Sequence, residues 1–132
     1  MNSLNKVLFI GNVGNTPEVK HFPNGMIVAK FNLATNEYYM DKNNQKQERV
    51  YWHKIVAFNG LADFVEKTIE KGDRIYVEGK LVTNSYIDSK NEKKYNTEIH
   101  SIQIIRLSKP KGYEDSKKNE SENDYYDSDL GF

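Results

Sequence analysis

The 132-residue sequence contains no cysteine, so it has neither a disulfide framework nor a cysteine-based zinc site. No apolar run reaches the length of a membrane helix or of the core of a signal peptide. Basic and acidic side chains balance at 19 each, so the net charge by itself indicates no partner. These absences predict a cytoplasmic protein that is not associated with a membrane.

The sequence also lacks a recognisable set of catalytic or metal-binding residues. An enzyme needs a nucleophile beside a base, paired carboxylates or converging metal ligands, whereas His21, His53 and His100 are scattered along the chain. Asp41 and Glu48 could join His53 in a metal-dependent nuclease, but both acids fall in a polar segment without a strand or helix pattern. We therefore predict a protein that is not an enzyme, with no catalytic residue, no metal and no cofactor.

The charges are divided between two parts of the chain. Residues 1–108 hold 15 basic and 12 acidic side chains, whereas residues 109–132 hold 4 basic and 7 acidic ones. The second part has no hydrophobic periodicity and is rich in Lys, Glu, Asp, Ser and Asn, which is typical of disorder. We predict a folded domain over 1–108 and a disordered acidic tail over 109–132.

The end of this tail combines acidic and apolar side chains. Apolar groups can fill a pocket on another protein while neighbouring carboxylates meet its Lys or Arg side chains. The alternative is an acidic end that only aids solubility. We interpret the end as a protein-docking tip formed by Asp127, Asp129, Leu130, Gly131 and Phe132.

Residues 50–58 are the most informative stretch of the folded domain. In a strand, Trp52, Lys54 and Phe58 share one face. A row of ring, cation and ring suits stacked bases threaded between phosphates. The alternative is a core strand whose Lys54 extends to solvent at an edge.

The rest of the domain shows strands separated by turns. Gly11 and Gly14 interrupt the first apolar run, and since no Gly-Lys-Ser/Thr sequence follows, they indicate a kinked strand and not a phosphate-binding loop. Pro23-Asn24-Gly25 predicts a hairpin turn between strands at 18–22 and 26–35.

The second half of the domain adds an arm, a helix and two strands. Tyr38, Tyr39 and the polar run after them predict a solvated hairpin arm over 36–48. Apolar residues at helical spacing predict a helix over about 61–71, with Asn59 as N-cap and Gly72 as the stop. Strands over 73–86 and 93–107, joined by a turn at 88–92, complete an all-β fold, a small barrel of about five strands.

Seven short motifs follow one another along the chain. They are Asn5-Lys6-Val7 running into Gly11-Asn12, Pro17-Glu18-Val19, Pro23-Asn24-Gly25, Leu33-Ala34-Thr35, Trp52-His53, Lys71-Gly72 and Val77-Glu78-Gly79-Lys80-Leu81. In order and spacing they resemble the bacterial and phage single-stranded DNA-binding proteins, and the likeness covers essentially the whole chain. The resemblance implies a five-stranded OB-fold barrel, sequence-independent binding of single-stranded DNA, and a homotetramer.

The resemblance also implies roles for individual residues. The base-stacking aromatics are expected to be Tyr39, Trp52, Phe58 and Tyr86. The cations that contact the DNA backbone are expected to be Lys6, Lys54 and Lys71, with Lys20, Lys30 and Arg74 as weaker candidates. Through the tail tip, the protein is expected to recruit replication and repair proteins at the nucleoid while it protects single-stranded DNA in replication, recombination and repair.

The sequence departs from the family at three points. Tyr39 and Tyr86 stand where many members have Trp, which keeps a stacking ring of smaller area. The linker after Ser108 is short and charged, where many members have a long one rich in Gly, Pro and Gln. The tip ends in Leu130-Gly131-Phe132 and not in Ile-Pro-Phe.

Two other functions stay open at the level of sequence. One is an OB-fold adaptor whose barrel assembles the oligomer while the tail recruits replication or repair proteins. The other is an RNA-binding OB-fold protein, since the fold alone does not decide the ligand.

Overall fold

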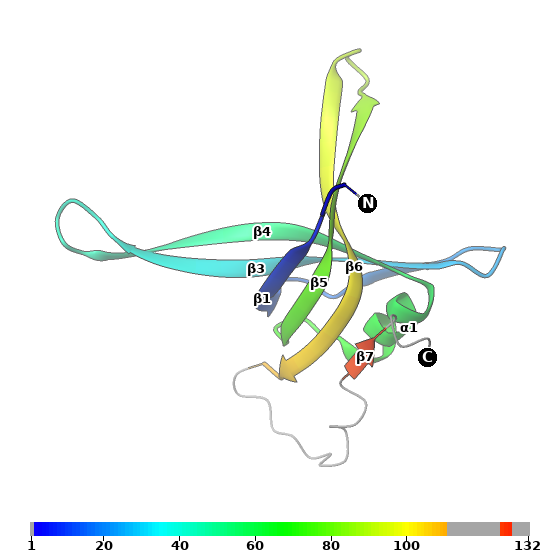
Figure 1. Cartoon of the computed structure of the whole chain (residues 1–132), viewed down its shortest axis with the longest axis horizontal. Helices are drawn as coiled ribbons and strands as arrows, with labels where there is room; N and C mark the ends of the chain where they lie inside the picture. Colours follow the sequence, from blue (N-terminus) through cyan, green and yellow to red (C-terminus); the bar gives the residue numbers. More distant parts are fainter. Residues whose placement is uncertain (1, 111–124, 128–132) are drawn as a thin grey trace.

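The computed structural model of the protein describes residues 2–110 and 125–127 (Figure 1). Strands dominate, and the helix is short. The prediction of an all-β fold with one helix is therefore confirmed. The elements are β1 (Val7–Val13), β2 (Glu18–His21), β3 (Ile27–Met40), β4 (Lys46–Phe58), α1 (Asn59–Thr68), β5 (Arg74–Ile87), β6 (Lys93–Ser108) and β7 (Tyr125–Asp127).

Five strands close the predicted barrel. β1 pairs antiparallel with β5, β5 with β6, and β3 with β4, while β6 runs parallel to β4. β1 completes the ring by meeting β3 through residues 12–13 and 33–34. Gly11 permits this crossing, because a Cβ at that position would collide with the carbonyl oxygen of Ala34. The first glycine of the apolar run thus marks a strand crossing, in agreement with the predicted kink.

The inward-facing residues of the barrel strands form the core. Leu33, Ile55 and Ile104 are fully buried and come from three different strands. The apolar side of α1 adds Phe64 and Val65 to the same cluster. Alternation along each strand accounts for this arrangement, since every second side chain points inward.

The helix lies two to three residues earlier than predicted. It begins at Asn59 and ends at Thr68, and Phe58 is the N-cap in place of Asn59. The Asn59 side chain instead accepts a hydrogen bond from the backbone N–H of Ile27 at 3.3 Å. Gly72 adopts φ +92° in the turn that follows and does not cap the helix directly.

Two hairpin arms extend from the barrel in different directions (Figure 1). The polar segment predicted as an arm is regular, because β3 and β4 stay paired as far as Met40 and Lys46. Each arm ends in a turn in which an aspartate, Asp41 or Asp88, accepts two backbone N–H groups. Asn44 and Asn91 occupy the left-handed positions at φ 62° and 64°. Both residue types suit such turns, because their short side chains bond locally.

A buried ion pair joins the start of β5 to the end of β6. Asp73 is fully buried, and its Oδ2 accepts hydrogen bonds from Arg106 Nε at 3.1 Å and from the backbone N–H of Glu70 at 2.8 Å. Burial raises the pKa of Asp73, an effect that Arg106 opposes. No local pattern in the sequence indicates this pair.

Most of the predicted tail lies outside the described residues, including Asp129, Leu130, Gly131 and Phe132. Residues 125–127 are described, and they form strand β7, which pairs with β6. Asp127 of the predicted tip is the last residue of β7. In the described ranges, no helix is long and apolar enough to cross a membrane.

Candidate nucleic-acid interface

One surface of the β3–β4 ribbon carries the predicted row of ring, cation and ring. The pairing of Trp52 with Ala34, Lys54 with Asn32, and Phe58 with Val28 has no interruption, so these residues share one side of the ribbon. We call this surface, with Trp52, Lys54, Phe58 and Lys30, the Trp52 face. Val56 belongs to it but is only 2% exposed.

Trp52 is exposed yet held in place. Its side chain is 61% exposed. The ring lies against Gly14, where a Cβ would collide with it. Gly14 itself is fixed by a hydrogen bond from its N–H to the carbonyl of Asn32 at 2.8 Å. Because Gly14 has no side chain, the indole packs flat against its backbone, while much of the ring stays open to solvent.

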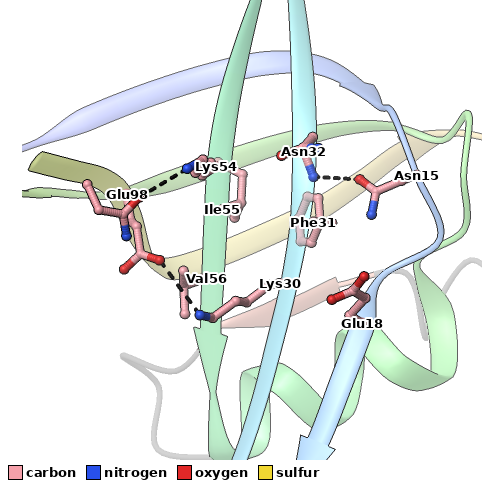
Figure 2. A pocket seen from close by; sticks show the side chains of 10 residues that line it. Asn15, Glu18, Lys30, Phe31, Asn32, Lys54, Ile55, Val56 and Glu98 are labelled. Carbon is pink, nitrogen blue, oxygen red and sulfur yellow. Dashed lines mark hydrogen bonds and ion pairs between the residues drawn. The ribbon is translucent and has the colours of Figure 1, made fainter. Parts of the chain in front are cut away.

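Along Lys54 and Lys30, the Trp52 face is hollowed into a groove (Figure 2). β2 and β6 form its walls, and Val56 lies between them. Lys30 and Lys54 line the part shown in Figure 2, and Lys20 and Phe58 line the adjoining part. Four of the ten predicted DNA-binding residues thus meet in one groove.

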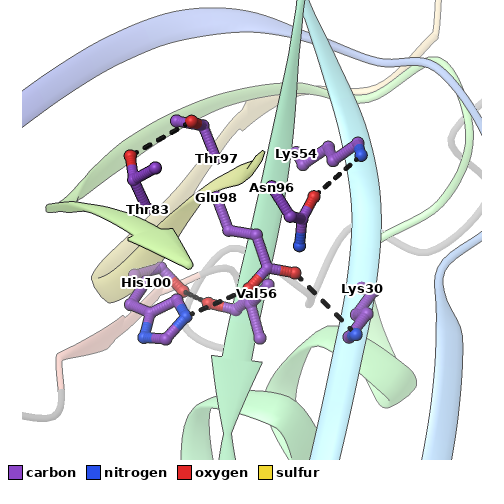
Figure 3. A network of polar contacts seen from close by, with 9 residues as sticks. Lys30, Lys54, Val56, Thr83, Asn96, Thr97, Glu98 and His100 are labelled. Carbon is purple, nitrogen blue, oxygen red and sulfur yellow. Dashed lines mark hydrogen bonds and ion pairs between the residues drawn. The ribbon is translucent and has the colours of Figure 1, made fainter. Parts of the chain in front are cut away.

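A chain of polar contacts sets the positions of the lysines (Figure 3). Lys54 Nζ donates to Asn96 Oδ1 at 3.0 Å, and Lys30 Nζ lies 3.8 Å from Glu98 Oε2. His100 Nε2 lies 3.4 Å from the other oxygen of Glu98. Among the described residues, no group of three or more His, Asp or Glu side chains could hold a metal ion. The groove therefore presents three lysines, amides and an aromatic ring beside two carboxylates, Glu18 and Glu98. Its lysines and ring suit an anionic ligand with flat groups, once the lysines are released from Asn96 and Glu98.

The aromatic residues continue at both ends of the groove. Phe58 makes an edge-to-face contact with His100, with ring centroids 5.2 Å apart. Tyr86 is 54% exposed on the β5–β6 arm, opposite Lys94. Asn84 pairs with Asn96, and Tyr86 pairs with Lys94 two residues farther along each strand. Tyr86 therefore lies on the same side of the arm as Asn96, whose side chain accepts the hydrogen bond from Lys54.

Tyr39 does not lie on the Trp52 face. Tyr39 pairs with Gln47, and Gln47 is an odd number of residues from Trp52 along β4. The Tyr39 ring is therefore on the opposite side of the ribbon, where its centroid lies 4.8 Å from the Arg49 guanidinium. Tyr38 shares the side of Trp52 and is 58% exposed, with Lys46 Nζ 4.5 Å from its ring centroid. Alternation across the hairpin selects Tyr38 once the register of the β3–β4 pairing is known.

Three predicted cations come from other parts of the barrel. Lys6 precedes β1, where its Nζ lies 3.5 Å from Glu78 Oε1. Lys71 is in the turn after α1, and Arg74 begins β5, where it donates to Asn12 Oδ1 at 3.4 Å. None of these three lines the groove described above.

His53 lies on the inner side of β4, as expected for a histidine facing away from Trp52. Its ring stacks on Phe9 with centroids 4.0 Å apart, and Nε2 is 2.9 Å from Thr35 Oγ1. Burial lowers its pKa below the usual 6.5. The residue supports the core and is not part of the groove.

We expect His53 to make folding stability depend on pH. With a lowered pKa in the folded state, the unfolded chain binds a proton first as the pH falls below 6.5, so stability decreases in that range and is retained above it. Urea unfolding at about pH 7.5 and about pH 5.5 measures the loss. The His53→Gln variant, which cannot titrate but can bond Thr35, should lose less. An equal loss in both proteins would contradict this role of His53.

The chain is similar in sequence to known proteins. A sequence model described as the Single-strand binding protein family matches residues 4–107. The chain is 48% identical over 112 residues to a single-stranded DNA-binding protein of Bacteroides thetaiotaomicron, covering 83% of the chain and 69% of that relative. It is 46% identical over 97 residues to single-stranded DNA-binding protein 1 of Chlorobaculum tepidum, covering 73% of the chain and 60% of the relative.

Two solved structures share the fold. The first, a Plasmodium falciparum SSB in complex with ssDNA, has a TM-score of 0.75 and 37% identity, over 82% of this chain and 98% of that one. The second is a deletion mutant of the single-stranded DNA binding protein from Thermus aquaticus, with a TM-score of 0.69 and 28% identity, over 80% of this chain and 51% of that one.

Proposed function

The chain belongs to the single-strand binding protein family, and on that premise we propose that it binds single-stranded DNA along the Trp52 face without sequence preference. The observation that carries this proposal is the seating of Trp52, a largely exposed indole held on Gly14 beside Lys54. An exposed indole costs hydrophobic free energy unless a ligand covers it, and a nucleobase is a ligand of matching shape.

Binding combines stacking with neutralisation of phosphates. Trp52 and Phe58 each stack on a base, worth about 1–3 kcal/mol per base, and every base has a flat face to offer. Lys54 leaves Asn96 and Lys30 leaves Glu98 to meet the phosphates. The released Glu98 carboxylate keeps a partner in His100, 3.4 Å away. No bond in the DNA is made or broken, so the protein acts as a binder and not as an enzyme.

The strand extends beyond the groove in this proposal. Tyr86 continues the path on one arm, and Tyr38 continues it on the other, since both lie on the side of the lysine groove. Tyr39, Lys6, Lys71 and Arg74 contact a strand that passes around the barrel onto its other surfaces. This longer path suits wrapping of DNA over several copies of the chain.

A titration of oligo-dT against the fluorescence of the sole tryptophan tests the proposal. Single-stranded DNA should quench Trp52 strongly, whereas duplex DNA of equal length should not. If Lys20, Lys30 and Lys54 supply the phosphate contacts, log affinity should fall with log salt at a slope of about −2, since each contact contributes roughly −0.7. Equal responses to the two DNAs, or no response, would rule out stacking at Trp52.

We propose that copies of the chain associate through the outer surface of β1, consistent with a homotetramer. Leu8 and Ile10 are 55% and 51% exposed there. Residues 7–11 of β1 pair with β5 on one side and, within the described ranges, with no strand on the other. An apolar surface next to an open strand edge is a common self-association site.

Charge substitutions on this surface should dissociate the assembly. We expect the double variant Leu8→Glu and Ile10→Glu to sediment as a monomer, because the carboxylates cannot be buried against a second copy. Light scattering coupled to gel filtration measures the mass. The matched control is Ile87→Glu on the β5–β6 arm, where the side chain is 69% exposed, and it should leave the mass unchanged. A wild-type chain that is already monomeric would refute the assembly.

The tail tip and cellular role complete the proposal. Asp127, Asp129, Leu130, Gly131 and Phe132 recruit replication and repair proteins to DNA held by the barrel, in the cytoplasm at the nucleoid. Two rivals are separated by the same titration. A barrel that ignores oligo-dT but binds oligo-rU would be an RNA-binding protein, and one that ignores both would be an adaptor.

A further inference from the structure

β6 offers an open backbone edge on the side away from β5. Its parallel contact with β4 is limited to Ile99 and His100. Beyond these residues, the edge is taken up by β7, which pairs antiparallel at Gln103, Ile104 and Ile105. In Figure 1, β7 lies between β6 and α1.

This edge is rigid before any strand binds to it. Ile104 is fully buried in the core. Two residues on, Arg106 is tied to the buried Asp73 at 3.1 Å. On its other side, β6 is paired with β5 along this stretch. A strand that adds here therefore meets a preformed template, as in peptide recognition by strand addition.

The occupant is the chain's own tail. The tether between Ser108 and Tyr125 is 16 residues long, which holds the β7 sequence near the edge at an effective concentration in about the millimolar range. Among the described residues, three pairs join β7 to β6, few enough for the docked strand to be released again.

We propose that the β6 edge at Gln103–Ile105 is a docking site for Tyr125–Asp127 of the same chain, and that this docking competes with capture of the tail tip by a partner. The competition follows from Asp127, which belongs both to β7 and to the proposed tip. A partner that grips Asp127 must first detach the end of β7. If the docked form is favoured about tenfold, the apparent affinity of the partner falls about tenfold. The consequence for partners rests on the proposed function, whereas the docking does not.

Hydrogen exchange on the full chain tests the docking. In an antiparallel pair, successive N–H groups point to alternate sides, so Tyr125→Pro with Tyr126→Pro removes at least one donor to β6. We expect exchange at the β7-facing amides of Gln103–Ile105 to become at least about tenfold faster. The matched control, Gly112→Pro with Tyr113→Pro, places two prolines elsewhere in the tail and should change nothing there.

A Fab raised against a synthetic peptide of residues 127–132 tests the competition, because its epitope excludes both prolines. It should bind the Tyr125→Pro, Tyr126→Pro variant about tenfold more tightly than the wild type, and its binding should release the protection of Gln103–Ile105. The proposal would be overturned by unchanged exchange in the variant or by equal Fab affinities for the two proteins. It would also be overturned if protection grew with protein concentration, because that would indicate a strand from a second copy. Neither readout uses DNA, so a failure here and a failure of DNA binding are distinguishable.

Discussion

Replacing Trp52 with alanine is expected to weaken binding of oligo-dT by about 1–3 kcal/mol, or roughly 5- to 150-fold. The indole is largely exposed, so its loss leaves no cavity in the core. The substitution should therefore lower the affinity for DNA without lowering the free energy of unfolding. Anisotropy of a labelled oligonucleotide measures the affinity, because the variant has no tryptophan of its own. Urea unfolding should show nearly unchanged stability.

Three further variants locate this effect. Trp52→Phe keeps a smaller ring and should lose less affinity than Trp52→Ala. Gly14→Ala should also weaken binding, since its Cβ pushes the indole off its seat and shifts its emission. The matched control is Tyr95→Ala, another exposed ring, 67% exposed, which lies on the side of the β5–β6 arm opposite Tyr86. An affinity of Trp52→Ala equal to the wild type would show that the DNA path lies elsewhere.

Removing Arg106 is expected to destabilise the barrel strongly. Arg106→Ala leaves the carboxylate of Asp73 fully buried without its cation, which should lower the free energy of unfolding by about 3–5 kcal/mol. Urea unfolding monitored by circular dichroism measures the loss. The double change Asp73→Asn with Arg106→Met should recover much of it, because the buried charge is removed together with its partner.

The pH dependence of the Arg106→Ala variant separates this cause from lost packing. The pKa of Asp73 is already raised in the folded protein, so between the unfolded value and the folded one the folded state holds more protons, and lowering the pH favours folding. Without Arg106 this effect should strengthen. The deficit relative to wild type should therefore be smaller at about pH 5 than at about pH 8. A deficit that is independent of pH would point to packing alone.

The predicted site shows how far local pattern can be followed. Residues 50–58 could be assigned to two faces because strand alternation is a local rule. The same rule, applied across the hairpin, separates Tyr38 from Tyr39, but only once the register is known. In the arm, both faces are exposed and hydrophobic alternation disappears, so the sequence predicted an arm without its strand pairing.

Other features could not be predicted because they join distant parts of the chain. No local pattern marks Asp73 as buried, and only the fold brings it to Arg106, 33 residues away. Asn59 looked like a helix cap, but the β2–β3 hairpin supplies Ile27 as a competing partner. β7 has too few residues to give a pattern, and its partner strand β6 comes from a distant part of the chain.

The sequence by itself determined the class of fold, the position of the helix to within three residues, and the side of the strand on which Trp52, Lys54 and Phe58 lie. These properties depend on periodicity and turn chemistry, which act over a few residues. Only the tertiary structure decided the seat of Trp52 on Gly14, the contact of Lys54 with Asn96 and the burial of Asp73. Closing a barrel fixes which distant strands become neighbours, and that choice depends on the packing of the whole core.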